Sequence, residues 1–242
     1  MEPLVLFLGV AAALGLAYLV TRPLRERRRV KDITEWADMN GWERAEAATD
    51  AQLPYRWPGG PFLEQRKEPA TDVMYGNVSG HRMISFTHTW RTGKEGSRFS
   101  RKRYAHVIAL DEDAAEPRLE LTPEGWRDKI QKVFGGQDVQ LGNPAFDDAW
   151  RVRASDDVFA RRVLDPRFMS MLMLPDYQKT NIRVDGPAVM LWTDGKTNVE
   201  NLSKKSGKLV EVARLTVPLE KGQPVFESGG DLNLPGMGFE KI

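Results

Sequence analysis

The chain starts with an uninterrupted run of apolar residues. Residues 3–20 carry no charged side chain. As an α-helix they would be about 27 Å long, close to the roughly 30 Å hydrocarbon core of a bilayer. A cleaved signal peptide would start with basic residues, whereas the only charged side chain before this run is Glu2. The pattern therefore predicts a single, uncleaved transmembrane helix.

After this run the apolar spacing becomes first helical and then alternating. Residues 30–41 place Ile33, Trp36 and Ala37 on one helical face, and Gly41 is typical of a helix end. From Val73 onwards, alternation predicts strands, and a Gly-Pro pair predicts a turn between the last two. The predicted strands are 73–78, 81–90, 104–110, 118–122, 138–141, 146–154, 182–185 and 188–193.

Capping residues predict helices between and after these strands. Thr122 followed by Pro123, and Ser155 followed by two aspartates, are typical N-terminal signals. The predicted helices cover 123–134, 155–164, 167–174 and 198–215.

Strands and helices are mixed irregularly, without the regular alternation of a doubly wound fold. This order predicts an α+β domain with a mainly antiparallel sheet and several packed helices, preceded by the transmembrane helix. Residues 43–61 are rich in proline and glycine but contain aromatic residues, which favours a structured loop. The predicted organisation is an anchor with a basic flank at 1–31, a domain at 32–221 and a loose tail at 222–242.

The charge balance changes when the chain is divided at residue 31. The 242 residues have a net charge of +1, but residues 1–31 hold six basic and two acidic residues and sum to +4. The remaining residues sum to −3. Because basic flanks stay cytoplasmic, this asymmetry predicts an inner-membrane protein whose large domain faces the cytoplasm.

Motifs for catalysis, cofactors and metals are missing from the sequence. There is no cysteine, and His81, His88 and His106 do not have the spacing of zinc ligands. The segment 194–197 ends like a phosphate-binding loop, but Met190 occupies the position of its first glycine. We predict no catalytic, cofactor-binding or metal-ligating residue, which weighs against an enzyme but leaves one with an unrecognised site as an alternative.

A basic segment at 91–103 is the strongest candidate for binding. It holds six basic residues and one acidic residue, so it could contact anionic lipid or simply form a solvated hairpin tip. Nucleic acid is disfavoured, because few aromatic residues are interleaved with the charges. The basic flank of the anchor has the same two interpretations, lipid contact or a topology signal. The candidate lipid-contact residues are Arg25, Arg27, Arg28, Arg29, Arg98, Arg101, Lys102 and Arg103.

The stretch 141–174 resembles a family of actinobacterial-type membrane proteins classed as a domain of unknown function. Asn143 and Asp165 depart from the family pattern, which has an acid and a threonine there, and many relatives have two membrane spans. The resemblance implies a membrane protein and brings no catalytic residues. The matching positions are Pro144, Phe146, Trp150, Val152, Asp157, Ala160, Arg161, Leu164, Pro166 and Met169.

These observations predict a single-pass membrane protein that presents a cytoplasmic binding or scaffold module. Its expected partners are the membrane and a second membrane protein, and no cofactor is expected. The alternatives are a membrane-bound enzyme and a sensor of anionic lipid that acts through residues 91–103.

Overall fold

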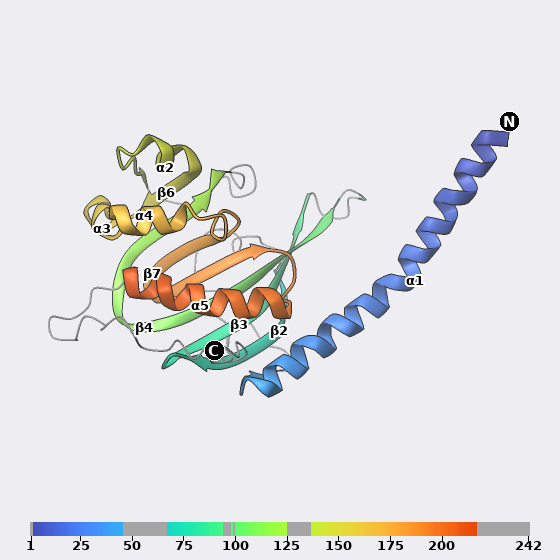
Figure 1. Cartoon of the computed structure of the whole chain (residues 1–242), viewed down its shortest axis with the longest axis horizontal. Coiled ribbons are helices and arrows are strands. Elements are labelled where there is room, and N and C mark those ends of the chain that lie inside the picture. The colour runs from blue at the N-terminus through green and yellow to red at the C-terminus, as the bar shows by residue number, and fades with distance from the viewer. Residues whose placement is uncertain (1, 46–66, 94–97, 99, 125–136, 217–242) are drawn as a thin grey trace, which may run out of the picture.

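The computed structural model describes residues 2–45, 67–93, 98, 100–124 and 137–216 (Figure 1). Most of the predicted helix at 123–134, most of the proline-rich loop and the C-terminal tail lie outside the described residues. Pro123, expected at the first position of that helix, instead ends strand β4. The elements are α1 (Glu2–Met39), β1 (Glu43–Arg44), β2 (Lys67–Val78), β3 (His81–Thr92), β4 (Arg101–Pro123), β5 (Gln137–Asp138), α2 (Pro144–Ala149), β6 (Trp150–Ala154), α3 (Asp157–Val163), α4 (Pro166–Leu172), β7 (Asn181–Asp194) and α5 (Val199–Thr216).

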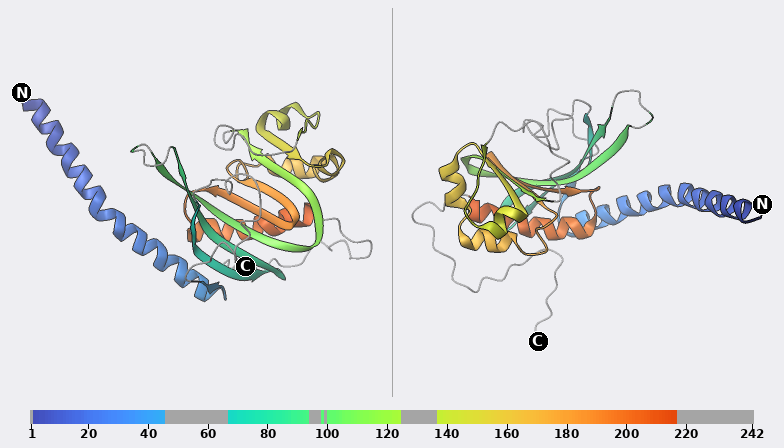
Figure 2. Two further views of the ribbon diagram at one scale, coloured as in Figure 1. Left: turned by 180° about the vertical axis from the view of Figure 1, so that it is seen from behind. Right: turned by 90° about the horizontal axis from the view of Figure 1, so that it is seen from above.

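The described strands form one seven-stranded antiparallel sheet. Its order is β1-β2-β3-β4-β6-β5, and β7 pairs with β4. The first half of β4 pairs with residues 188–194, and its second half pairs with residues 182–184. Figures 1 and 2 show β4 curving around β7, which turns back at Gly186 with a φ of +61°. This turn agrees with the turn predicted at the Gly-Pro pair. The parts of β7 before and after it both lie within the curve of β4.

The predicted strand over 146–154 is wrong in its first half. The Asn143 side chain accepts a hydrogen bond from the Phe146 backbone N–H, and Pro144 begins α2. A capped helical turn therefore replaces the extended conformation, and the strand starts only at Trp150. The helix after it is capped by Asp156 rather than by the expected Ser155.

Most of the core lies on one face of the sheet. Ile108 and Leu191 from the strands belong to the same buried cluster as Leu209 of α5 and Phe168 of α4. The end of α1 adds Ile33, which is buried with Trp36 and Ala37 as the helical spacing predicts. A second cluster lies on the other face and consists of Ala70, Val73, Phe86, Ala105, Val107, Ala109, Ala188, Met190 and Trp192.

The predicted transmembrane helix is corrected by the structure. α1 runs without a break from the apolar residues into the basic segment, and its described side chains from Thr21 onwards are densely charged. Charged side chains are costly in hydrocarbon. Among the described residues, no helix is both long and apolar enough to cross a membrane. The fold class is therefore a seven-stranded antiparallel sheet with packed helices, and no span is assigned to it.

Candidate functional site

The hairpin of β3 and β4 extends well beyond the rest of the sheet (Figure 1). Its ladder runs from the pair Met83 and Leu110 to the pair Thr92 and Arg101, which confirms the hairpin predicted from the sequence. We call the described residues of its outer part, 91–93, 98 and 100–103, the basic arm. The side chains of Arg98, Arg101, Lys102 and Arg103 are all exposed on it.

The described basic side chains of α1 point largely into solvent. Arg25, Arg27 and Arg28 are exposed, as is Arg22 one turn earlier. In Figures 1 and 2, α1 and the basic arm lie on the same side of the molecule; the outer end of α1 is its uncharged part, and its basic residues lie between that end and the domain. Two basic segments, about 70 residues apart in sequence, therefore lie on one side of the molecule.

Arg29 differs from the other candidate residues because it faces the domain. Its Nη1 atom donates hydrogen bonds to Asp72 Oδ2 at 2.9 Å and to the Thr197 carbonyl at 2.7 Å. Its Nη2 atom donates to Glu26 Oε1 at 2.7 Å. Only 17% of the side chain is exposed. Arg29 thus joins α1 to the sheet, while the other seven candidates stay exposed.

Further polar groups take part in the contact between α1 and the sheet around Arg29. Thr87 Oγ1 donates to Asp72 Oδ2 at 2.8 Å and accepts from the Thr197 N–H at 2.9 Å. Lys196 Nζ lies 2.7 Å from Glu26 Oε1. The hydrogen bond from Arg29 is the main cause that lowers the pKa of Glu26 to about 2. We call this group the α1 junction, and its members are Glu26, Arg29, Asp72, Thr87, Lys196 and Thr197.

A second polar group is buried between the sheet and α5. Lys205 Nζ donates to His106 Nδ1 at 2.9 Å and to Thr193 Oγ1 at 2.6 Å. His106 Nε2 lies 2.9 Å from Ser85 Oγ, and the accepting Nδ1 leaves Nε2 as the protonated nitrogen. A serine beside a histidine resembles an activated nucleophile, but with its proton on Nε2 the imidazole donates to Ser85 Oγ and cannot remove the hydroxyl proton. Ser85 and His106 are also 0% exposed, so no substrate reaches them in this structure.

Burial controls the protonation of this group. It lowers the pKa of Lys205 to about 7, with a smaller contribution from the charge of Lys208. Burial is also the main cause that lowers the pKa of His106 well below its usual value, and Lys205 adds to the effect. No sequence motif marks these residues, although Lys205 interrupts the apolar face that Leu202 and Leu209 define on the predicted helix.

The pKa of Lys205 predicts a pH-dependent stability. Between about pH 7 and 10.5 the unfolded chain keeps a proton on Lys205 that the folded chain has released, so the free energy of unfolding should rise with pH. The slope from this group is at most about 1.4 kcal/mol per pH unit. Urea denaturation at pH 7, 8 and 9 should show a flatter profile for Lys205→Met than for the wild type.

The matched control for this prediction is the neighbouring Lys204→Met. Lys204 is largely exposed and pairs with Glu200 on the same helix. Its replacement should keep the wild-type slope. Equal slopes for the wild type and Lys205→Met would contradict a depressed pKa at Lys205.

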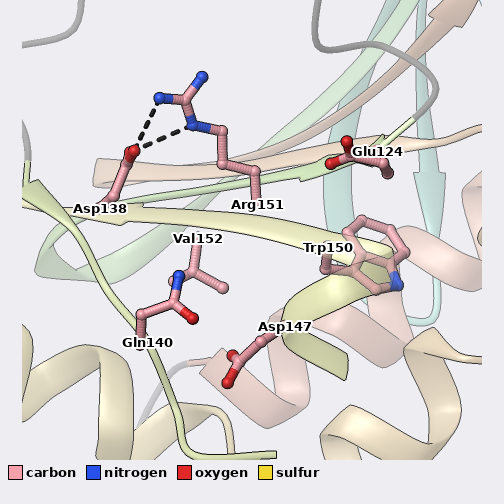
Figure 3. A pocket seen from close by; sticks show the side chains of 7 residues that line it. All are labelled: Glu124, Asp138, Gln140, Asp147, Trp150, Arg151 and Val152. Carbon is pink, nitrogen blue, oxygen red and sulfur yellow. Dashed lines mark hydrogen bonds and ion pairs between the residues drawn. The ribbon is translucent and has the colours of Figure 1, made fainter. Parts of the chain in front are cut away.

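A surface hollow of about 280 Å³ lies beside β6 (Figure 3). Two of its carboxylates are already engaged by protein groups. Asp138 binds Arg151 at 2.7 Å, and Asp147 accepts the backbone N–H groups of Leu141 and Gly142 at 3.0 Å. The hydrogen bond from Arg151 is the main cause that lowers the pKa of Asp138. The residues around the hollow are Glu124, Asp138, Gln140, Asp147, Trp150, Arg151 and Val152.

These contacts describe structural ion pairs and caps rather than a catalytic pair of carboxylates. Among the residues that the structure describes, no group of three potential ligands lies close enough to hold a metal ion. His88 stacks on Trp90 with ring centroids 5.5 Å apart.

Comparison with known proteins gives a likeness in fold. One solved structure, the mycobacterial trehalose monomycolate transport factor A, TtfA, superposes with a TM-score of 0.56 over 80% of this chain and 98% of its own. The two chains share this fold. Their sequences are 17% identical, so the likeness extends to the fold alone. No family model and no curated protein matches the sequence.

The structure thus places most of the sequence-predicted lipid-contact residues on one side of the molecule and turns one of them, Arg29, inward. The resemblance of residues 141–174 to a family of membrane proteins stays a prediction. Within this stretch, Phe146 and Trp150 stack with centroids 6.2 Å apart, and Arg161 pairs with Asp157 at 2.8 Å. The first contact packs two aromatic rings, and the second stabilises one turn of α3.

Proposed function

We propose that this chain is a membrane-associated binding or scaffold module that works at the cytoplasmic surface of the bacterial inner membrane. One observation carries the proposal, namely that the basic arm and the basic part of α1 lie on the same side of the molecule (Figures 1 and 2). Each basic side chain near an anionic bilayer contributes about 1 kcal/mol of attraction. At physiological salt the Debye length is about 8 Å, so this attraction acts on the side chains that come close to the headgroups.

The fold likeness supports a transport-related role at a membrane. The superposed structure is that of a transport factor for trehalose monomycolate. A scaffold that holds another membrane protein is consistent with this role. The buried position of Ser85 and His106 favours such a module over a serine-based enzyme.

Binding to anionic vesicles tests the proposal. Replacing Arg101, Lys102 and Arg103 together with glutamine should weaken binding about 100-fold, because three contributions of ~1 kcal/mol are lost. The measurement is flotation of the full chain with vesicles of 30% phosphatidylglycerol, relative to neutral phosphatidylcholine vesicles. The ratio cancels any apolar contribution that both vesicles share.

A triple variant with the same charge change serves as the control. Arg161, Arg162 and Arg167 are exposed on α3 and α4, away from the basic arm (Figure 1). Replacing them with glutamine should leave the ratio unchanged. A wild-type chain without preference for anionic vesicles, or equal losses in both triple variants, would overturn the proposal.

A further inference from the structure

We infer that the α1 junction holds α1 and the basic arm in a fixed relative position, so that they form one two-part surface for an anionic bilayer. The inference rests on the proposed function and adds to it a positioning device and a division of roles among the basic residues. The junction residues position the surface, and the seven exposed basic residues contact the lipid headgroups.

The junction joins three parts of the chain that are distant in sequence. Glu26 and Arg29 come from α1, whereas Asp72 and Thr87 come from the adjacent strands β2 and β3. Lys196 and Thr197 follow β7 directly. The guanidinium of Arg29 contacts all three parts, because it donates to Glu26, to Asp72 and to the Thr197 carbonyl. α1 is therefore held at several points where it leaves the domain.

The same junction reaches the base of the basic arm. Lys196 Nζ pairs with Glu26 and also lies 5.0 Å from the centroid of the Tyr104 ring. Tyr104 directly follows Arg103, and its carbonyl accepts a hydrogen bond from the Gly195 N–H at 2.9 Å. One lysine thus connects α1 with the strand that carries the arm. A cation over an aromatic ring is attracted to its face, which favours this placement.

The backbone at Asp72 indicates that this arrangement is specifically maintained. Asp72 has a φ of +54°, in the left-handed region that side chains other than glycine rarely adopt, and it lies at an irregularity in the pairing of β2 with β3. Strained residues persist where the surroundings hold them. Here Arg29 and Thr87 bind the Asp72 carboxylate, whose side chain is only 6% exposed. The irregularity turns this carboxylate toward α1.

A bilayer fits this side of the molecule better than a nucleic acid does. Leu24 is 58% exposed among the basic residues of α1, and Phe7 is 70% exposed further along the helix. Apolar side chains beside basic ones suit the boundary between headgroups and acyl chains. An aliphatic side chain such as Leu24 adds nothing to a contact with phosphodiesters, and a nucleic-acid site would need several aromatic side chains among the basic residues to stack on successive bases. Two basic segments on a rigid frame also bind a flat charged surface more tightly than two independent segments.

Spin labels test the positioning without lipid. Since the sequence has no cysteine, Leu24→Cys and Thr92→Cys give one labelled pair across α1 and the arm. The full chain in detergent should show one narrow distance distribution. Glu26→Gln combined with Arg29→Gln removes both charges of the junction on α1, keeps the net charge, and should broaden the distribution. An equally narrow distribution in this variant would overturn the inference.

Vesicle binding then tests whether the fixed position of α1 and the basic arm strengthens binding to anionic lipid. The Glu26→Gln and Arg29→Gln variant retains the seven exposed basic residues but should bind phosphatidylglycerol vesicles at least 10-fold more weakly. The control is Asp157→Gln with Arg161→Gln, which removes an exposed ion pair on α3 and should bind as the wild type does. Circular dichroism should show that both variants keep the wild-type fold.

The outcomes separate this inference from the proposed function. If the wild type does not prefer anionic vesicles, the proposed function fails. If it does prefer them but the junction variant binds equally well, only the two-part surface fails. If the wild type binds duplex DNA more tightly than anionic vesicles at the same salt, the bilayer is the wrong partner and the inference is overturned.

Discussion

Replacing Arg183 with methionine is expected to lower the free energy of unfolding by about 3 to 5 kcal/mol. Arg183 and Glu120 lie opposite each other on β7 and β4, with side chains only 0% and 2% exposed. Arg183 donates to Glu120 Oε2 at 2.7 and 3.1 Å and stacks on Trp192 at 5.3 Å. Burial raises the pKa of Glu120, and the charge of Arg183 opposes this rise. Without Arg183, a carboxyl group is left in the interior without its main partner.

Urea denaturation at pH 7 measures this loss. The control is Arg161→Met, which breaks an ion pair that is about half exposed and should cost less than 1 kcal/mol. The double variant Arg183→Met with Glu120→Met removes both charges and should recover much of the loss, because a buried pair is often replaceable by apolar side chains. If Arg183→Met is as mild as Arg161→Met, the buried pair does not have this role.

Replacing Gly76 with alanine is expected to cost about 2 to 4 kcal/mol of stability. Trp42 lies flat against β2 at this position, and a Cβ atom on residue 76 would overlap its indole ring. Trp42 is 4% exposed and packs against Trp36 with centroids 5.5 Å apart. The added methyl group would push the indole out of the contact between α1 and the sheet.

A double variant distinguishes this overlap from a general loss of strand stability. Trp42→Leu shortens the ring side chain, so Gly76→Ala should cost clearly less in that background than in the wild type. Thermal or urea unfolding of the four chains gives the coupling energy. A Gly76→Ala variant within 0.5 kcal/mol of the wild type would contradict the close packing.

Local patterns predicted the regular parts of the sheet and the contact face of α1. Alternation identified β3 and the first half of β4, and the register of the two strands confirms their hairpin. The sequence did not show that β4 continues through its acidic stretch to Pro123, because residues 111–116 have the composition of a turn. Their pairing depends on β7, which lies far away in sequence. The helix at Pro144 was missed because an apolar alternation concealed a capped turn.

In the candidate site, too, some features could be predicted from the sequence and others could not. Exposure of the basic residues could be predicted, since runs of like charge favour solvent. The inward orientation of Arg29 could not be, because its partner Asp72 is 43 positions away and turns toward α1 only through its unusual backbone conformation. Lys205 was predictable in principle, because a lysine on the apolar face of a helix requires a buried partner.

The curve of β4 around β7 has a consequence for how the chain acquires its structure during synthesis. Residues 101–123 leave the ribosome well before residues 181–194, with which both halves of β4 pair. Until then each half lacks a neighbour along one edge, and such edges can associate with other chains. Because these contacts join distant parts of the sequence, folding should be slow and should be completed late, after β7 is released. A nascent chain that ends before Asn181 should therefore require a chaperone to stay in solution.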